Sequence, residues 1–371
     1  MKFLFIAPNV PLSEIHLSRP YFELPRLFAR KGWSSVLVAG KINAPTPKEI
    51  KTYETGVGTN RHIDIFRVFT RVLKILGLEQ PDMVVFFHMN LLLTPFIVLY
   101  KIADICKGFG TNHKTIWLLK LDWDGTRFSD SGKLKMILRD FFLSINSLFL
   151  DFLVAENTCG QRATLSLPFV GMNKVVLIPN SYSLDLPILE YSSCERENLV
   201  ICVGRISPEK GIEILIRSFA KVHNEFPNWN LKLVGPIEDT NYFEKMKTLV
   251  SMSGTSTRIS FIGPLYRDEL RDIYSRAAIF CLPSLVESYG IVRAEAIASG
   301  IPLITTSAGC GLDFEKYGSI VVPSGNIEEL TLALTRLMRD KETRIRISKL
   351  QQSTFPGYID LFGKYEELMR I

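Results

Sequence analysis

The sequence has few of the residues that build disulfide frameworks and metal sites. Its 371 residues include six cysteines and five histidines. The cysteines have neither the paired spacing of a metal site nor the density of a disulfide scaffold, so we expect reduced thiols in a cytoplasmic protein. The sequence also lacks a Lys/Arg cluster with interleaved aromatic residues. We therefore expect no nucleic-acid partner and no metal.

Uncharged stretches long enough to cross a membrane are scarce as well. Residues 83–100 reach the low end of such a span. However, Asn90 and Thr94-Pro95 interrupt this stretch, and its beginning suits a buried strand. The apolar N-terminus is too short for a signal peptide and is more typical of a first strand. We therefore expect no spanning helix.

The net charge of +6 is unevenly shared between the two halves of the chain. Residues 1–182 carry a net charge of +8, and residues 183–371 carry −2. A basic first half suggests an acidic acceptor or contact with the inner face of an anionic membrane. Residues 133–150 have a wide apolar arc with basic residues near its start. Two interpretations stay open: a core helix with a solvated end, or a helix resting on a bilayer.

Short apolar segments alternate with helical patterns along the whole chain. This order predicts an α/β protein with parallel sheets covered by helices. Two similar halves predict two Rossmann-like domains, residues 1–182 and 183–355, with a C-terminal helix at 356–371 crossing back to the first. In the first half, the Pro/Gly/Thr-rich residues 41–60 predict a loop, and Ile63–Phe66 predicts a short strand.

The remaining elements follow from the same periodicity. Strands are expected at 3–7, 36–39, 83–87, 115–121, 152–155, 175–178, 199–203, 230–234, 258–262, 278–282 and 302–305. Helices are expected at 20–31, 67–76, 91–105, 133–150, 211–224, 240–252, 267–276, 290–299 and 326–339.

Residues 278–305 have the pattern of a strand, a loop, a helix and a second strand. Glu287 lies in the loop and Glu295 in the helix that Gly290 opens. Eight helical positions would span about 12 Å, close to the distance between the sugar and the ribose of a nucleotide-sugar. The first amides of the helix would favour a phosphate between them. The stretch therefore predicts the donor site of a sugar transferase.

Residues 203–222 contain a second candidate element of this site. Arg205 follows an apolar strand, and Lys210 precedes Gly211 and a helix. Because ligands of open parallel sheets bind at the carboxyl ends of the strands, both cations are expected at the same crevice. Two cations suit a diphosphate leaving group, whose charge grows as the glycosidic bond breaks.

Together these stretches resemble the signature of the retaining, family-4 glycosyltransferases (glycosyl transferases group 1), which have the two-domain GT-B fold. The matching residues are the pair Arg205 and Lys210-Gly211, and the Glu287–Glu295 spacing with Ser288-Tyr289-Gly290 after the first Glu. Further similarities are Ile178-Pro179-Asn180, where Ser181 replaces the usual Gly, and the turn Phe261-Ile262-Gly263-Pro264-Leu265.

The resemblance implies a role for each of these residues. Arg205 and Lys210 would bind the diphosphate, Glu295 the ribose hydroxyls, and Glu287 the transferred sugar. Backbone amides would complete the donor site, in which the expected residues are Arg205, Lys210, Leu265, Ser288, Tyr289, Gly290, Ile291, Val292 and Glu295. The implied reaction is retention by front-face attack, without a metal or another cofactor. The donor would be a UDP-, GDP- or ADP-sugar, and the acceptor a saccharide or lipid-linked molecule of the cell envelope.

The first half departs from the family pattern. The loop at residues 8–13 has no glycine, although many members have a glycine-rich loop there. Asp122 occupies about the place where many members have a histidine, so it becomes a candidate catalytic residue. His16 and His88 each follow a predicted strand, although a structural role is the more common one for a lone histidine.

Four other interpretations stay open. Asp122 and Asp124 with Gly125-Thr126 resemble the nucleophile loop of Mg-dependent haloacid-dehalogenase-type phosphatases. The same two residues match the Asp-x-Asp of metal-dependent, single-domain glycosyltransferases. The missing glycines suggest a non-catalytic nucleotide-sugar-binding subunit, and the architecture also suits a sugar-nucleotide epimerase. Neither Asp-x-Asp resemblance explains Arg205 and Lys210.

Overall fold

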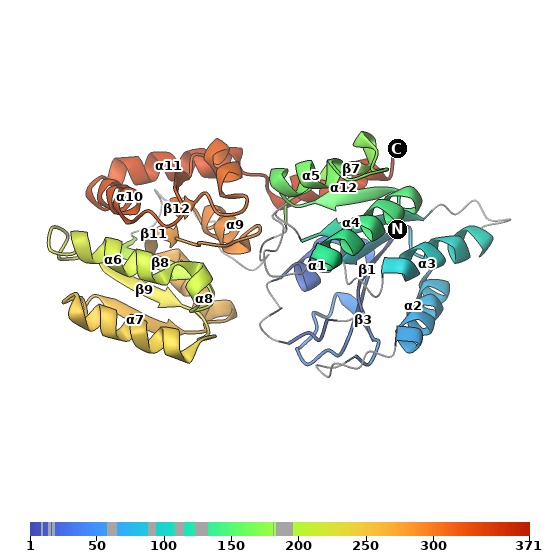
Figure 1. Cartoon of the computed structure of the whole chain (residues 1–371), viewed down its shortest axis with the longest axis horizontal. Coiled ribbons are helices and arrows are strands. Elements are labelled where there is room, and N and C mark those ends of the chain that lie inside the picture. Colours follow the sequence, from blue (N-terminus) through green and yellow to red (C-terminus); the bar gives the residue numbers. More distant parts are fainter. Residues whose placement is uncertain are drawn as a thin grey trace. The chain divides into compact units, whose positions relative to one another are not determined.

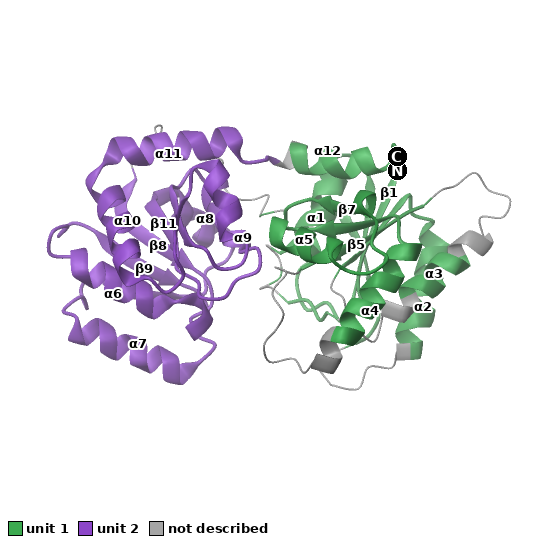
Figure 2. Ribbon diagram, turned by 45° about the horizontal axis from the view of Figure 1, so that its top comes forward, with its two compact units in different colours: residues 1–184, 358–371 green, residues 185–357 purple. Residues whose placement is uncertain are grey.

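The computed structural model describes residues 1–8, 10–13, 16, 19–57, 65–87, 94–107, 115–122, 133–180, 182 and 196–371. The chain divides into two compact units (Figure 2). Unit 1 contains residues 1–184 and 358–371, and unit 2 contains residues 185–357.

Unit 1 contains a seven-stranded parallel sheet with the order β3-β2-β1-β4-β5-β6-β7 (Figure 1). The strands are β1 Lys2–Ala7, β2 Ser34–Ala39, β3 Ile50–Glu54, β4 Met83–Phe87, β5 Ile116–Leu121, β6 Phe152–Ala155 and β7 Val175–Leu177. The helices are α1 Pro20–Arg30, α2 Ile65–Glu79, α3 Thr94–Lys107, α4 Lys133–Phe149, α5 Thr158–Leu165 and α12 Tyr358–Leu368. The central strands are buried throughout, as expected for a parallel sheet covered on both faces.

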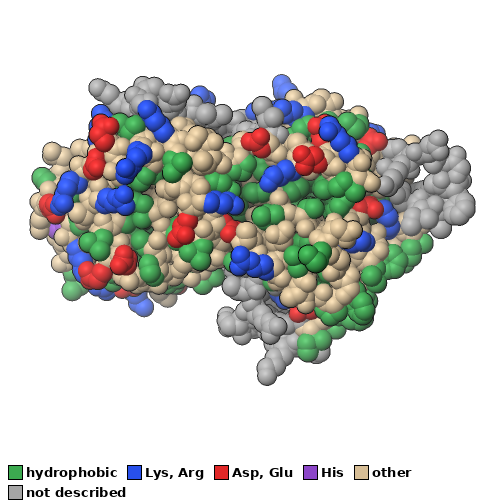
Figure 3. Space-filling view, turned by 90° about the horizontal axis from the view of Figure 1, so that it is seen from above, with side chains coloured by type: hydrophobic (Ala, Val, Ile, Leu, Met, Phe, Trp, Pro, Cys, Tyr) green, Lys and Arg blue, Asp and Glu red, His purple; other side chains and the backbone are tan. Residues whose placement is uncertain are grey.

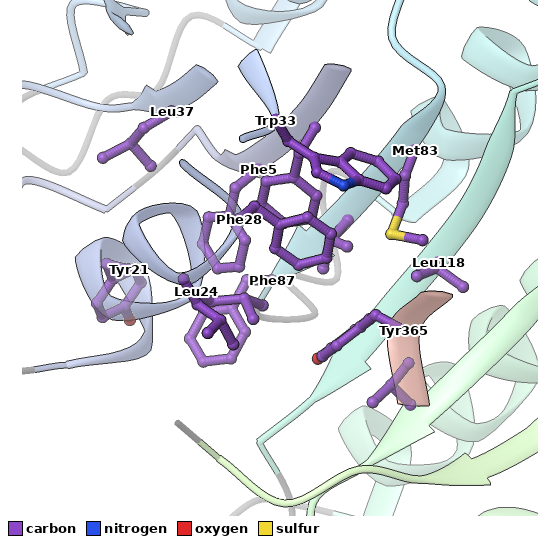
Figure 4. Close-up of a cluster of buried hydrophobic side chains, with 14 of the residues drawn as sticks. Phe5, Tyr21, Leu24, Phe28, Trp33, Leu37, Met83, Phe87, Leu118 and Tyr365 are labelled. Atoms are coloured by element: carbon purple, nitrogen blue, oxygen red, sulfur yellow. The ribbon is translucent and has the colours of Figure 1, made fainter. Parts of the chain in front are cut away.

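Each face of this sheet has its own apolar core. Residues of α1 and α12 pack on one face (Figure 4), and residues of α2, α3 and α4 pack on the other. The ring of Phe28 in α1 lies 5.2 Å from Phe362 and 5.6 Å from Tyr365, centroid to centroid. The C-terminal helix therefore belongs to the core of unit 1, as predicted for a helix at 356–371 that crosses back to the first domain.

Unit 2 contains a six-stranded parallel sheet with the order β10-β9-β8-β11-β12-β13. The strands are β8 Glu197–Val203, β9 Asn230–Val234, β10 Ile259–Gly263, β11 Ala277–Leu282, β12 Leu303–Thr306 and β13 Ile320–Val322. The helices are α6 Ile212–Val222, α7 Thr240–Met252, α8 Arg267–Arg276, α9 Ile291–Ala298, α10 Ile327–Arg339 and α11 Lys341–Thr354. The strand order reverses between β8 and β11, which is where ligands bind in open parallel sheets.

Two predictions for the first half were wrong. The loop expected at 41–60 contains β3, which pairs with β2 alone as the edge strand of the sheet. The strand expected at Ile63–Phe66 falls partly in α2, which begins at Ile65. Two adjacent apolar residues do not distinguish a strand from a helix, whereas the buried Val68, Val72 and Ile75 follow helical spacing.

The helices α5 and α11 and the short strand β13 were also not predicted. His88, Asp124 and the beginning of the helix expected at 91–105 lie outside the described residues. Within the described part of the chain, none of the helices combines the length and apolar character that a membrane span requires.

Candidate functional site

The candidate site forms where β8 and β11 lie side by side in the sheet of unit 2. These two strands pair directly, although 77 residues separate Lys210 from Glu287. Because both strands run in the same direction, the segments that follow them begin at the same edge of the sheet. Lys210 comes from the first segment and Glu287 from the second.

Backbone contacts hold these two segments together. The amides of Leu285 and Val286 both donate to the carbonyl oxygen of Glu209, at 2.8 and 3.1 Å. Gly211 has a φ of +64°, and a Cβ there would lie 2.1 Å from the carbonyl oxygen of Pro283. Only glycine permits this backbone conformation and this approach, which places Lys210 beside the second loop.

Lys210 and Glu287 form a largely buried ion pair. The Nζ atom of Lys210 lies 2.7 Å from Oε2 of Glu287, and their side chains are 14% and 10% exposed. The Ser284 hydroxyl donates to the same Oε2 at 3.4 Å, and the Ser288 amide donates to Oε1 at 3.2 Å. The site therefore holds a cation and a carboxylate in direct contact.

The charges around Glu287 keep it ionised. Burial alone would raise the pKa of Glu287, but the cations of Lys210 and Arg293 outweigh burial, and its pKa lies below the usual value. An ionised carboxylate accepts hydrogen bonds from hydroxyl groups and stabilises nearby positive charge. Both properties suit a group that faces a reacting sugar.

Arg293 supports the loop that carries Glu287. Its guanidinium is fully buried and donates to the carbonyl oxygen of Tyr289 at 3.3 Å and to that of Ala308 at 3.1 Å. Gly309, with a φ of +59°, packs against the same loop, since a Cβ there would lie 1.9 Å from the carbonyl oxygen of Glu287. The loops after β11 and β12 are thus held as one body.

The helix predicted after this loop begins later than the spacing argument assumed. Gly290 is the N-cap of α9, which runs from Ile291 to Ala298. The amides of Ile291 and Val292 lie in its first turn, as predicted, but Glu287 precedes the helix. The estimate of eight helical positions between Glu287 and Glu295 was therefore wrong, and only the last five are helical.

Glu295 lies on α9 and is only 3% exposed. It accepts a hydrogen bond from the hydroxyl of Tyr274, a residue of α8, at 3.0 Å. Glu295 thus lies under the surface, and its partner Tyr274 was not predicted from the sequence.

Arg205 differs from Lys210 in its ion-pair partners and in its greater exposure to solvent. Its guanidinium pairs with Glu238 and, at 3.0 Å, with Glu209, and the side chain is 45% exposed. Exposed ion pairs of this kind contribute little to stability, so their exchange for an anionic ligand costs little.

Two further residues predicted for the donor site differ in burial. Leu265 follows β10 and is partly buried, and Tyr289 is buried.

The candidate residues of unit 1 lie in segments that follow strands. Asp122 follows β5 and is exposed. The Nδ1 atom of His16 accepts from the amide of Ser13 at 3.0 Å, and burial lowers the pKa of His16. This local bonding suits a structural histidine.

A buried charged cluster in unit 1 was not predicted. The Nζ atom of Lys120 in β5 lies 3.3 Å from Oε1 of Glu156, and both side chains are at most 1% exposed. Asn180 donates to the other carboxylate oxygen at 2.5 Å, and the buried Tyr365 completes the cluster. The one sequence signal was Lys120 itself, a charge within an otherwise apolar strand.

Part of the chain is similar in sequence to known glycosyltransferases. Residues 190–353 match the family model described as glycosyl transferases group 1. The chain is 33% identical to D-inositol 3-phosphate glycosyltransferase of Corynebacterium glutamicum over 157 residues, 41% of this chain and 37% of that protein. It is 28% identical to sulfoquinovosyl transferase SQD2 of Arabidopsis thaliana over 248 residues, 65% of this chain and 45% of that protein. The matched segments thus span less than half of either relative.

The structural likeness extends over the whole chain. HepE of Anabaena, solved in complex with UDP, superposes with a TM-score of 0.72 at 15% identity and covers 100% of both chains. WaaG, a glycosyltransferase of lipopolysaccharide biosynthesis, superposes with a TM-score of 0.64 at 15% identity and covers 100% of this chain and 99% of its own. Residues 190–353 thus resemble the group 1 glycosyl transferases, and the chain has the GT-B fold.

Proposed function

We propose that the protein is a retaining, metal-independent glycosyltransferase that takes its sugar from a nucleotide-diphospho-sugar. UDP is the first nucleotide to test, because the structural neighbour HepE was solved with UDP and with UDP-glucose. The acceptor that we propose is a saccharide or lipid-linked molecule of the cell envelope, received by unit 1.

The observation that carries this proposal is the Lys210–Glu287 pair at the point where the strand order of unit 2 reverses. It combines a cation for the diphosphate with an ionised carboxylate for the sugar. The pair lies within residues 190–353, which match the transferase family. The first turn of α9 supplies backbone amides near the same loop.

In the proposed reaction, Lys210 and Arg205 stabilise the charge that gathers on the leaving diphosphate. Glu287 holds the hydroxyls of the transferred sugar and stabilises positive charge at its anomeric carbon. The acceptor attacks from the face that the diphosphate leaves, and the leaving phosphate accepts the proton of the acceptor hydroxyl. Lys210 contacts Glu287 before donor binds, so the two groups that act on opposite sides of the breaking bond are already paired.

Donor binding is the first test of this proposal. We expect millimolar UDP or UDP-glucose to raise the melting temperature, because a ligand at 100 times its dissociation constant stabilises by about 2.7 kcal/mol. A thermal-shift series with UDP, GDP, ADP and inorganic phosphate compares the bases. No shift with any of the three nucleotides would contradict the donor proposal.

Product analysis separates the proposed enzyme from its alternatives. Transfer from, or slow hydrolysis of, a labelled donor with retained anomeric configuration supports the transferase. Binding without turnover indicates a nucleotide-sugar-binding subunit. Acceptor-free conversion of the sugar indicates an epimerase, and Mg-dependent release of phosphate from a phosphomonoester indicates the phosphatase suggested by Asp122 and Asp124.

We also propose that unit 1 contacts an anionic membrane that carries the acceptor. Ile137, Phe141 and Leu148 share one stripe of α4 and are 64%, 55% and 56% exposed. Leu99 and Ile102 of the neighbouring α3 are 46% and 43% exposed. Figure 3 shows hydrophobic side chains at the surface of unit 1 with basic side chains among them. Such a surface, on a half with a net charge of +8, suits an anionic bilayer.

Vesicle flotation tests this membrane contact. We expect Phe141→Ser/Leu148→Ser to weaken the partition of the protein onto anionic vesicles by about thirtyfold, since partial burial of each side chain contributes on the order of 1 kcal/mol. Leu332→Ser is the matched control, because Leu332 is 62% exposed on α10 of unit 2. Equal binding of the double variant and the wild type, or equal losses in the double variant and the control, would contradict the proposal.

A further inference from the structure

Arg293 is an unusual residue at its position in α9. The helix sequence IVRAEAIA is otherwise apolar or small apart from Glu295, and the Arg293 side chain is completely buried. Burying a cation is costly unless hydrogen bonds and opposite charge compensate for the lost hydration. Its partners therefore indicate why the residue is there.

The partners of Arg293 come from both loops of the donor site. Besides its bonds to the carbonyl oxygens of Tyr289 and Ala308, Nε donates to the hydroxyl of Thr305 at 2.8 Å. Nη1 lies 3.8 Å from Sγ of Cys310, and the guanidinium lies 5.5 Å over the ring of Phe314. A planar group with donors in several directions can make all these contacts at once, and a lysine cannot.

The electrostatic effect of Arg293 reaches Glu287. Lys210 and Arg293 are cations whose charge lowers the pKa of Glu287 and opposes the effect of its burial. Lys210 touches the carboxylate, but a bound diphosphate would compete for the same ammonium group. Arg293 is buried beneath the loop, so it keeps its charge near Glu287 when Lys210 is shared.

We propose that Arg293 is the positioning residue of the donor site, tying the Glu287–Gly290 loop to the Ala308–Cys310 loop and keeping Glu287 charged and aimed. The inference rests on the proposed function, because it assigns the cause of the geometry and charge that sugar transfer would use. Arg293 is not a catalytic residue: it touches other protein groups and acts through Glu287.

Two substitutions separate the charge of Arg293 from its shape. Arg293→Gln removes the charge but keeps a hydrogen-bond donor, and Arg293→Lys keeps the charge but loses the planar fork. Arg196→Gln is the matched control, since the Arg196 guanidinium also donates to backbone carbonyl oxygens, those of Tyr274, Ala277 and Ser299, at 2.7 to 3.0 Å.

The direct readout is the titration of the Glu287 carboxyl carbon by NMR in protein labelled with carbon-13 glutamate. The signal is assigned by its loss in Glu287→Gln. We expect Arg293→Gln to raise the titration midpoint by about one pH unit or more, because an opposite charge nearby lowers a carboxyl pKa by 1–3. Arg293→Lys and Arg196→Gln should keep the wild-type midpoint. An unchanged midpoint in Arg293→Gln would overturn the electrostatic part of the inference.

Turnover of UDP-glucose tests the positioning part. We expect Arg293→Lys to lower kcat by about tenfold or more with a smaller change in KM, because misplaced groups weaken the transition state more than binding. The acidic limb of the pH profile should move upward in Arg293→Gln only. Wild-type values of kcat and KM in Arg293→Lys would overturn the positioning role. This test does not depend on Arg293→Gln, so it holds even if that variant does not fold.

Different results would contradict the proposed function and the role of Arg293. If wild-type protein neither binds UDP nor turns over UDP-glucose, the proposed function is at fault, and the NMR titration still tests the coupling of Arg293 to Glu287. If wild-type protein is active but neither variant changes the midpoint or kcat, the inference alone is wrong.

Discussion

Lys210→Met is expected to lower the rate of sugar transfer by about 10²- to 10³-fold, the usual cost of losing one preorganised group that stabilises transition-state charge. Glu287→Gln is expected to have a loss of similar size. Lys210 and Glu287 contact each other at 2.7 Å, so the two losses should not multiply in the double variant. Steady-state rates of the two single variants and the double variant measure this coupling.

UDP affinity distinguishes the two residues. Lys210→Met should weaken UDP binding by about tenfold or more, because a charge-assisted hydrogen bond contributes about 1.5–3 kcal/mol. Glu287→Gln releases Lys210 from its partner, so UDP binding should be unchanged or tighter although transfer is lost. Isothermal titration of both variants with UDP shows the difference.

Lys247→Met is the matched control for these variants. Lys247 belongs to the same unit, and its Nζ atom lies 2.8 Å from Glu244 in a pair that is about half exposed. The Lys247→Met substitution should leave both the transfer rate and the UDP affinity near the wild-type values. Full transfer activity in Lys210→Met or Glu287→Gln would remove both residues from the proposed site.

The central sheets could be predicted from the sequence because their strands are buried on both faces. A strand such as Met83–Phe87 is apolar at every position, and its neighbours in the chain have helical periodicity. The edge strand Ile50–Glu54 was missed because only its first residue is buried. It is held by pairing with β2, which is a long-range contact that local composition does not record.

The site shows the same division between local pattern and long-range packing. That Lys210 and Glu287 share one edge of the sheet followed from their positions after parallel strands. Their direct pairing did not follow, because it depends on the close approach of Gly211 to Pro283. The hydrogen bonds from Tyr274 to Glu295 and from Arg293 to Ala308 join residues 21 and 15 positions apart, and no spacing rule specifies them.

The buried pair of Lys120 and Glu156 leads to the largest expected effect on stability. Lys120→Met would leave the Glu156 carboxylate buried without its cation. Removing one partner of a buried ion pair costs about 3–5 kcal/mol, much more than losing an exposed pair. We therefore expect a large loss of stability in unit 1, together with faster hydrogen exchange in α12, whose Tyr365 packs at this cluster.

The loss should depend on pH in a defined direction. Burial raises the pKa of Glu156 to about 8, although Lys120 opposes the rise. Between the unfolded value of about 4.5 and this folded value, the folded state binds more protons than the unfolded state, so this group's contribution to stability falls as pH rises. Without Lys120 the folded pKa rises further. The destabilisation of Lys120→Met should therefore be smaller at pH 5 than at pH 8.

Urea unfolding at both pH values, followed through hydrogen exchange of the β5 and β6 amides, reports this loss for unit 1. Lys101→Met is the matched control, because Lys101 pairs with Asp151 at 3.0 Å but the pair is partly exposed, and we expect a loss of at most about 1 kcal/mol.

The double variant Lys120→Met/Glu156→Leu decides between a buried-charge effect and a simple loss of packing. Replacing both members of a buried pair by apolar residues is often neutral, so the double variant should recover most of the stability and lose the dependence on pH. If the double variant were as unstable as Lys120→Met, the stranded carboxylate would not be the cause. In that case the volume and shape of the Lys120 side chain beneath Tyr365 would explain the loss, and it would be equal at pH 5 and pH 8.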